Sequence, residues 1–242
     1  MNVGGSVMHN DKENKLDLVR TTKRWPLLLK RTIDLLITIP LLILFAPFFL
    51  LLGIIIKLES EGPIFFRQNR LGFYGKVFRI FKFRSMLTNL HRPVTDSLHK
   101  DDPRITSFGN ILRKYRLDEL PQLINVLKGE MSLVGPRPLL PEFLDSYSEE
   151  DRRRMNLPPG MTGWQQVHGS ATNSWEQRIA LDLWYIDHWN IFIDFFVMFL
   201  TIKVVLKAET VYDKDGFQRS GIPSHSLKGK DEAKLPHSTE KD

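Results

Sequence analysis

The 242-residue chain contains no cysteine, which excludes disulfide bonds and zinc sites built on thiolates. It also has no glycine-rich Walker loop, no serine nucleophile elbow, and no spacing of His, Asp and Glu that indicates a zinc site. The long apolar run begins beyond residue 30 and lacks a small-residue cleavage site after it, so a secretory signal peptide is not predicted. These absences disfavour P-loop nucleotidases, serine hydrolases and zinc enzymes, and they allow a reducing cytosolic setting.

Acidic residues are the scarcer charged class: 28 Asp and Glu stand against 34 Lys and Arg, a formal net charge of +6. Such a surplus favours anionic partners, namely lipid headgroups, nucleic acid or phosphorylated substrates. Residues 1–27 form a basic N-terminal segment that is expected to be disordered, and the polar tail 208–242 is expected to be partly disordered. The length between them suits one domain with an appendage.

What the chain does have is one long run without any charge, LLITIPLLILFAPFFLLLGIII at residues 35–56. At about 20 residues it is long enough to cross a bilayer as a helix. Pro40 and Pro47 lie inside it. Pro47 removes a backbone donor and clashes with the preceding turn, so it is expected to bend the helix near its middle. The freed carbonyls need partners, and Thr38 is positioned in the sequence to back-bond to one of them.

Basic residues flank this run on both sides, whereas a spanning helix usually carries its basic excess on the cytoplasmic flank alone. We therefore predict a re-entrant membrane hairpin, helix–break–helix, over residues 28–58. A straight or kinked spanning helix is the alternative, because prolines are tolerated in membrane helices. A second apolar stretch, residues 192–207, is too short and too charged to span, and is expected either to lie in the membrane interface or to pack in the core.

Basic and aromatic side chains alternate in residues 63–86, which include Lys82 and Arg84. This pattern predicts a short strand or hairpin with a basic face, turning at Gly72 and Gly75. Basic residues between aromatic ones bind nucleic acid, phosphate or membrane, or simply form a solvated face near anionic lipid. The pattern itself does not choose among these.

An acidic pair, Asp118 and Glu119, follows a predicted helix at 105–117 and precedes another at 121–128 that ends at a glycine. Carboxylates often stand before a helix only because exposed amides and the helix dipole favour them. In the other interpretation, neighbouring arginines such as Arg113 hold a phosphate while one carboxylate attacks it or binds a metal. Adjacent helical side chains differ by about 100° in direction, so the two acids are expected to have distinct roles.

Two rigid loops complete the polar body. In GPRP the prolines fix the backbone and aim Arg137. In PPGMTGW, Trp164 is expected either to stack on a base or to belong to the core. The expected fold is therefore mostly α with a small β element: the re-entrant membrane hairpin and a cytoplasmic domain, 59–207, with amphipathic interfacial helices.

In their order, these pieces resemble the bacterial sugar transferase family, the monotopic phosphoglycosyl transferases. The resemblance covers residues 28–207 and rests on KRTIDLLI, the proline-bent run, GPIFFRQNRLG, FRIFKFRSM, RKYRLDELPQLINVLKGEMSLVGPRPLL and PPGMTGWQQVHG. Each motif is weak alone, but all of them in register are highly specific.

The resemblance implies transfer of a sugar phosphate from a UDP-sugar to a polyprenyl (undecaprenyl) phosphate, with release of UMP. The reaction would take place at the cytoplasmic face of the bacterial inner membrane and begin synthesis of a lipid-linked glycan or exopolysaccharide. It implies Asp118 as the nucleophile, forming an aspartyl phosphosugar intermediate, and as a ligand of Mg²⁺. Glu119 would assist, as base for the acceptor. The substrate-binding residues would be Lys82, Arg84, Arg113, Arg137 and Trp164.

The expected partners are therefore the UDP-sugar, the polyprenyl phosphate and inner-leaflet lipid, and no nucleic acid. Both substrates are anionic, which gives the cations of the site a physical reason to converge. The chain departs from related sequences in two places. It has Ala46 before Pro47 where a serine is common, and His168-Gly169-Ser170 where a Gly-Arg pair is common. The competing hypothesis is a non-catalytic, membrane-anchored protein that binds anions or lipid and is indifferent to the acidic pair.

Overall fold

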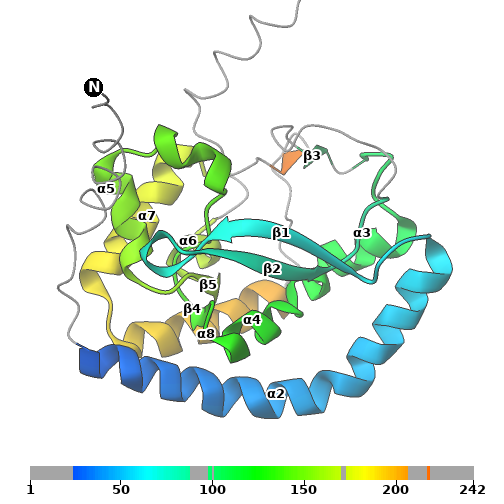
Figure 1. Cartoon of the computed structure of the whole chain (residues 1–242), viewed down its shortest axis with the longest axis horizontal. Helices are drawn as coiled ribbons and strands as arrows, with labels where there is room; N and C mark the ends of the chain where they lie inside the picture. Colours follow the sequence, from blue (N-terminus) through cyan, green and yellow to red (C-terminus); the bar gives the residue numbers. More distant parts are fainter. Residues whose placement is uncertain (1–23, 88–97, 100, 170–172, 207–216, 219–242) are drawn as a thin grey trace, which may run out of the picture.

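The structure is a computed structural model that describes residues 24–87, 98–99, 101–169, 173–206 and 217–218. Most of the predicted N-terminal segment and all but two residues of the tail lie outside these residues. The chain is mostly helical, as expected, with three small two-stranded sheets among the described residues. Figure 1 shows one long helix beneath a body in which a β-hairpin lies in front of the shorter helices.

The long helix, α2 (Arg24–Glu59), is continuous over 36 residues and passes through both Pro40 and Pro47. Figure 1 shows it running under the body and then curving up one side. The predicted helix break is therefore wrong. A proline removes one intrahelical hydrogen bond and bends the axis, but its neighbours keep theirs. The hydroxyl of Thr38 has no hydrogen-bond partner among the described residues, so the expected back-bond is not formed.

One face of α2 packs against the body. Lys30, Asp34 and Thr38 follow one another at helical spacing and are at most 5% exposed, and Leu52 and Ile56 are buried further along. By length and composition the helix is able to cross a membrane, and only 17% of its most apolar window is buried in the protein. It is thus a poor candidate for the core helix of a soluble protein. The re-entrant arrangement stays a prediction.

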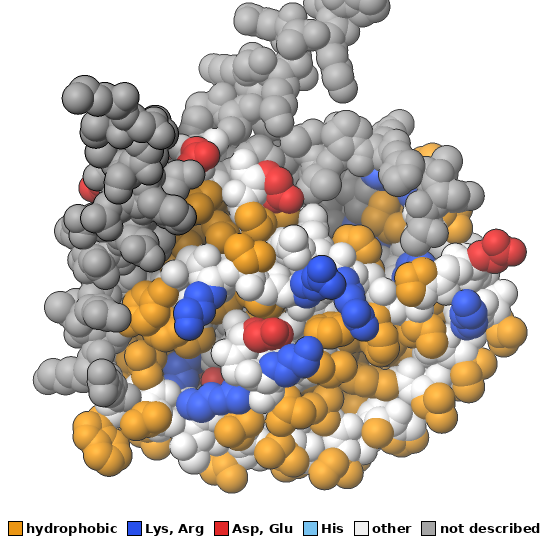
Figure 2. Space-filling model, viewed as in Figure 1, with side chains coloured by type: hydrophobic (Ala, Val, Ile, Leu, Met, Phe, Trp, Pro, Cys, Tyr) orange, Lys and Arg blue, Asp and Glu red, His pale blue; other side chains and the backbone are white. Residues whose placement is uncertain are grey.

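The other face of α2 and much of α8 (Ile191–Leu206) expose large apolar side chains, which Figure 2 shows along the lower edge of the molecule. We call this surface the apolar face. Its members on α2 are Leu28, Leu29, Leu36, Ile39, Ile43, Leu44, Leu50, Leu51, Ile54 and Leu58, and on α8 they are Phe192, Phe195, Phe196, Phe199, Ile202 and Leu206. Contiguous patches of this kind mark interaction surfaces. Since Val197 and Asp194 are buried, one side of α8 packs in the core as expected, and its place in the membrane interface stays a prediction.

The predicted hairpin is confirmed: β1 (Phe65–Leu71) pairs antiparallel with β2 (Val77–Phe83). Its tight turn, η2 (Phe73–Gly75), holds Gly75 at φ 72° and Tyr74 at φ 52°. Asn125 covers the open edge of β2, because its side chain accepts from the amide of Phe81 and donates to the carbonyl of Arg79. An unpaired sheet edge is thereby satisfied by a helix.

The remaining elements surround this hairpin and position the acidic pair. They are β3 (Leu98–His99), α3 (Ser107–Lys114), η3 (Leu117–Glu119), α4 (Gln122–Lys128), β4 (Ser132–Val134), η4 (Pro141–Ser146), α5 (Glu149–Arg152), η5 (Arg153–Asn156), β5 (Gly160–Thr162), α6 (Trp164–Val167), α7 (Trp175–His188) and β6 (Phe217–Gln218). β4 and β5 are parallel, and β3 pairs with β6. The main core lies between α2, α4, β2, α7 and α8, with Tyr185 and Val126 fully buried.

Gly135 and Gly160 bring the two rigid loops into contact. A Cβ on Gly135 would lie 2.2 Å from the carbonyl oxygen of Pro158, and one on Gly160 would lie 2.1 Å from the amide nitrogen of Gly135. No other residue fits at such distances. The GPRP and PPGMTGW loops therefore brace each other, which fixes the backbone that carries Arg137.

Candidate active site

The acidic pair lies on η3, a short turn between α3 and α4. Thr106 caps α3 by accepting a hydrogen bond from Gly109, and the chain then reverses through Arg116 in the left-handed conformation, φ 56°. A non-glycine residue in that region is uncommon and marks a locally constrained turn. Asp118 is buried, at 8% exposure, and follows directly. The turn thus places the carboxylate just before α4, as the sequence predicted, and buries it, which the sequence did not predict.

Glu119 is held by cations from two other segments. The Lys82 Nζ lies 2.6 Å from its Oε1, and the Arg137 Nη2 lies 3.6 Å from the same oxygen. Lys82 reaches it from β2 and Arg137 from the GPRP loop, so residues 37 and 18 positions apart from Glu119 converge. Three of the predicted site residues are therefore brought together with Asp118.

The two adjacent carboxyl groups titrate in opposite directions. Burial raises the pKa of Asp118 to about 6, because the attraction of Lys82 offsets only part of that cost and the charge of Glu119 adds to it. Burial alone would raise the pKa of Glu119 too, but the charges of Lys82 and two arginines outweigh it and hold that pKa well below its usual range. Glu119 is thus a fixed anion, and Asp118 changes charge near neutral pH.

The other predicted residues are distributed differently. Arg113, at the end of α3, lowers the pKa of Asp118 by its charge and so acts on the site. Arg84 is 4% exposed, and its guanidinium donates to the carbonyls of Ile56, Ser60 and Pro63, at and just after the end of α2. Its place in substrate binding stays a prediction, and the contacts seen here are structural.

Trp164 belongs to an aromatic stack formed by α6, α7 and α8. Its ring lies 4.3 Å from that of Trp184 and 4.1 Å from that of His168, and Phe196 is 6.3 Å away. The ring is partly buried and packs against the main core. These contacts favour the core interpretation, and a role of Trp164 toward substrate stays a prediction.

Arg70 was not anticipated. On the hairpin, Arg70 and Lys82 share a face, since the register pairs Phe66 with Lys82 and Arg70 follows at even spacing. Burial and the charge of Arg137 lower the pKa of Arg70 to about 10, and Glu119 opposes this. The alternation of β1 together with the position of Lys82 in β2 was the signal that could have found it.

A buried ion pair of Arg154 with Asp182 also lies behind the GPRP loop. Arg154 donates to a carboxylate oxygen of Asp182 and, at 3.4 Å, to the carbonyl of Arg137. Burial raises the pKa of Asp182, and Arg154 opposes the rise. The partners are 28 positions apart, and no local pattern announces such a pair. It supports the backbone of Arg137 from within.

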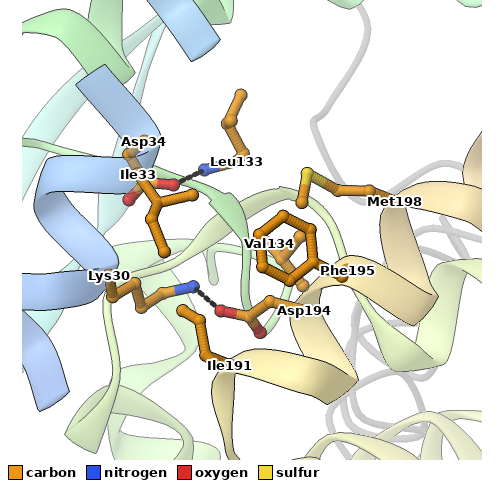
Figure 3. A pocket seen from close by; sticks show the side chains of 9 residues that line it. All are labelled: Lys30, Ile33, Asp34, Leu133, Val134, Ile191, Asp194, Phe195 and Met198. Carbon is orange, nitrogen blue, oxygen red and sulfur yellow. Dashed lines mark hydrogen bonds and ion pairs between the residues drawn. The ribbon is translucent and has the colours of Figure 1, made fainter. Parts of the chain in front are cut away.

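A second polar cluster fixes α2 to the body, as Figure 3 shows around a small pocket. Lys30 Nζ lies 2.6 Å from Asp194 Oδ2 on α8, and both side chains are at most 5% exposed. Tyr185 donates to the other oxygen of Asp194 at 2.6 Å. Asp34 accepts from the Leu133 amide at 3.1 Å. The apolar helix is therefore held at a defined position against α8 and β4.

A divalent metal would find few protein ligands at this site. Among the described residues, no group of three or more His, Asp or Glu side chains gathers to hold an ion. Mg²⁺ is commonly bound by one or two carboxylates together with substrate phosphates. Asp118 fits that pattern as a single ligand, whereas Glu119 is bound to Lys82.

Comparison with known proteins identifies the family to which this chain is similar. The model of the family described as bacterial sugar transferase matches residues 25–208. The uncharacterized sugar transferase EpsL of Bacillus subtilis (strain 168) is 43% identical over 185 residues, which are 76% of this chain and 91% of the relative. The match therefore covers almost the whole length of that relative.

Two relatives with specific names are longer proteins. The UDP-N-acetylgalactosamine-undecaprenyl-phosphate N-acetylgalactosaminephosphotransferase of Aeromonas hydrophila is 41% identical over 184 residues, 74% of this chain and 44% of the relative. The UDP-glucose:undecaprenyl-phosphate glucose-1-phosphate transferase of Escherichia coli (strain K12) is 40% identical over 183 residues, 72% of this chain and 39% of the relative. The chain spans less than half the length of these two. The family model nevertheless takes in the apolar helix, the acidic turn and both rigid loops, and the chain belongs to the bacterial sugar transferase family.

Proposed function

We propose that the protein transfers a sugar 1-phosphate from a UDP-sugar to a polyprenyl phosphate such as undecaprenyl phosphate, releasing UMP, in lipid-linked glycan or exopolysaccharide synthesis. The observation that carries the proposal is the buried carboxylate of Asp118 beside a second acid whose charge Lys82 and Arg137 neutralise. The named relatives act on undecaprenyl phosphate, but their sugars differ, so the sugar is left open.

The first step forms a covalent intermediate. A carboxylate oxygen of Asp118 attacks the β-phosphorus of the UDP-sugar, and the bond from that phosphorus to the bridging oxygen breaks, so UMP leaves with the electron pair. In the second step a phosphate oxygen of the polyprenyl phosphate attacks the same phosphorus, and the bond to Asp118 breaks. Both steps bring anions together, which requires nearby positive charge. Lys82, Arg113 and Arg137 are among the described cations whose charges act on the two carboxyl groups.

The low pKa of Glu119 changes the role expected for it. A carboxylate held ionised by Lys82 and two arginines is a weak base. A phosphate monoester has a second pKa of about 6 and is largely ionised near neutrality, so the acceptor needs little help from a base. We therefore assign Glu119 to holding Lys82 and Arg137 in place. When bound, Mg²⁺ would be held by Asp118 and the donor diphosphate, and would neutralise charge on the latter.

The apolar face gives the reaction a location. A lipid-borne phosphate lies at the membrane surface, whereas a nucleotide sugar is soluble, so the enzyme must work at the boundary. We propose that α2 and α8 sit in the cytoplasmic leaflet of the bacterial inner membrane, with α2 re-entrant. A membrane-impermeant label at each end of α2 tests this, and labelling of either end from outside intact cells would disprove the re-entrant topology.

The test of the activity is UMP release from a panel of UDP-sugars, with and without polyprenyl phosphate and Mg²⁺. We expect release with at least one sugar, and loss of it in Asp118→Asn. The competing hypothesis, a non-catalytic anion-binding anchor, predicts salt-sensitive anion binding that is unchanged in that variant. A pure anion binder gains nothing from a buried carboxylate at its centre, which is why we favour catalysis.

A further inference from the structure

The hairpin has a second basic face, opposite to the one that carries Lys82. Side chains alternate along a strand, so Phe81 points away from the acidic pair. Two cations contact its ring: the guanidinium carbon of Arg67 lies 4.9 Å from the ring centroid, and the Nζ of Lys128 lies 4.7 Å from it. Arg79 is exposed on the same side of β2. We call Arg67, Arg79 and Lys128 the basic collar.

The charges of the collar are not compensated within the part of the chain that the structure describes. None of the three forms an ion pair with another described residue. The nearby carboxylate of Glu130 binds the side-chain amide of Asn125 at 2.7 Å. Cations held together on one ring repel each other, and cation–π contacts at exposed sites are weak. The collar therefore favours an external anion.

The collar lies where the polar body meets the apolar helix. Lys128 follows Leu127, which is 42% exposed. Arg31 of α2 donates to the carbonyls of Val126 and Leu127, the latter at 2.8 Å, and so ties the end of α4 to α2. Figure 2 shows Lys and Arg side chains gathered over β1, β2 and α4, above the apolar lower edge. Positive charge thus borders an exposed apolar surface.

We propose that the basic collar binds the headgroups of anionic phospholipids when the apolar face lies in the bilayer. This rests on the membrane function proposed above. A lipid surface offers both an apolar phase and a plane of phosphate groups, which matches an apolar face with cations along its border. A nucleic acid would match the charge but not the apolar surface. The collar is also on the other side of the hairpin from Glu119, so it is separate from the substrate phosphates.

The test measures thermal unfolding of the full chain in phosphatidylcholine micelles titrated with phosphatidylglycerol. Each cation near an anionic surface changes affinity about fivefold. We therefore expect the lipid to raise Tm in the wild type, less so at high salt, and Arg67→Gln/Lys128→Gln to need at least about tenfold more lipid for the same shift. The matched control is Lys76→Gln/Arg153→Gln, which removes the same charge from the turn of the hairpin and from η5. It should behave as the wild type.

Several results would overturn the collar. One is an equal loss of the lipid-induced rise in Tm in both double variants. The others are a wild-type Tm that phosphatidylglycerol does not change, and an equal rise in Tm when an oligonucleotide replaces the lipid. UMP release is measured on the same preparations. If Arg67→Gln/Lys128→Gln raises the KM for the UDP-sugar, the collar belongs to the substrate site and the proposal is wrong. If the wild type releases no UMP, the proposed function fails, while the lipid titration still reports on the collar.

Discussion

The acidic turn and the apolar face are opposites in composition, yet each violates the usual distribution of side chains. The turn buries a carboxylate, Asp118, that water would solvate better. The apolar face exposes large side chains such as Phe192, at 79%, and Leu58, at 83%, that a soluble protein would bury. Both features cost stability in water, and both are understandable if a soluble nucleotide sugar meets a lipid at this molecule.

The two regions also differ in how they are supported. The turn is surrounded by directional contacts: Lys82 and Arg137 to Glu119, and Asn125 to the edge of β2. The helices that carry the apolar face make their directional contacts with the body on their inner side, where Lys30 pairs with Asp194. Changes in the turn should therefore act on chemistry, and changes in α2 should act mainly on membrane placement.

The largest effect is expected from Asp118→Asn. Turnover should fall at least about a thousandfold, because an amide cannot form the phosphosugar intermediate. Stability should move the other way. Because the pKa of Asp118 is raised in the folded protein, its carboxyl group stabilises the fold fully only at a pH below its pKa in the unfolded chain. That stabilisation is lost as the pH rises through about 6.

At pH 7.5 the variant should thus be more stable by roughly 1–3 kcal/mol, and the gap should close as pH falls below about 4. Chemical denaturation at the two pH values measures this. A variant that is less stable than the wild type at pH 7.5 would show that burial of the charged carboxylate does not destabilise the fold. The acidic turn would then not share with the apolar face a cost in stability.

The next effect concerns pH. In the wild type, activity should fall as pH drops below about 6, because protonated Asp118 is no nucleophile. Lys82 lowers that pKa, so Lys82→Met should move the acid limb of kcat/KM to higher pH and reduce the plateau about a hundredfold. Lys76→Met, at the hairpin turn, is the control. An acid limb that stays in place in Lys82→Met would remove Lys82 from the charge balance of the site.

A smaller effect should separate positioning from chemistry. Asn125 makes three hydrogen bonds from a fully buried side chain, to Phe81, Arg79 and Glu130. Asn125→Leu leaves these groups unpaired and should cost about 2–4 kcal/mol of stability. Because β2 carries Lys82, kcat should fall more than KM rises, and the acid limb should shift as in Lys82→Met. A stability loss with an unchanged pH profile would mean that Asn125 only holds the fold.

The smallest effect is expected on the apolar side. Ala46→Ser puts a hydroxyl beside Pro47, where it can donate to a carbonyl that the proline leaves free. We expect a stabilisation of about 0.5–1 kcal/mol in detergent and no change in turnover. Ala46→Thr and Ala46→Val are a matched pair that differs only in that hydroxyl. If the serine and threonine variants gain nothing over valine, the bend needs no additional hydrogen bond.

Local features of the sequence predicted most of the fold. The hairpin, the helix ending at Gly129 and the place of the acidic pair follow from alternation, capping and proline rules, and each is observed. The helix break at Pro47 was wrong because one missing hydrogen bond is weak against the cooperativity of a 36-residue helix. The break was inferred from the local rule that proline disrupts a helix, and from the basic residues on both flanks of the apolar run.

The site was only half predictable. Asp118 and Glu119 are adjacent, and the resemblance pointed to Lys82 and Arg137, but no spacing announces that these cations meet one carboxylate. Arg84 shows that a motif alone does not identify a site residue. It is basic and lies in the right motif, yet its two Nη atoms donate to backbone carbonyls at and just after the end of α2. Contacts between distant segments depend on tertiary packing, which a single sequence does not display.

The most direct test of the central claim is mass spectrometry of the intact protein after incubation with a UDP-sugar in the absence of polyprenyl phosphate. The intact mass should rise by one sugar phosphate, with release of an equivalent of UMP, and a digest of the same sample should place the adduct on the peptide that contains Asp118. The adduct should disappear when polyprenyl phosphate is added. Glu119→Gln should still form the adduct, more slowly, whereas Asp118→Asn should not. UMP release that requires both substrates at once, with no adduct on Asp118, would contradict the two-step mechanism.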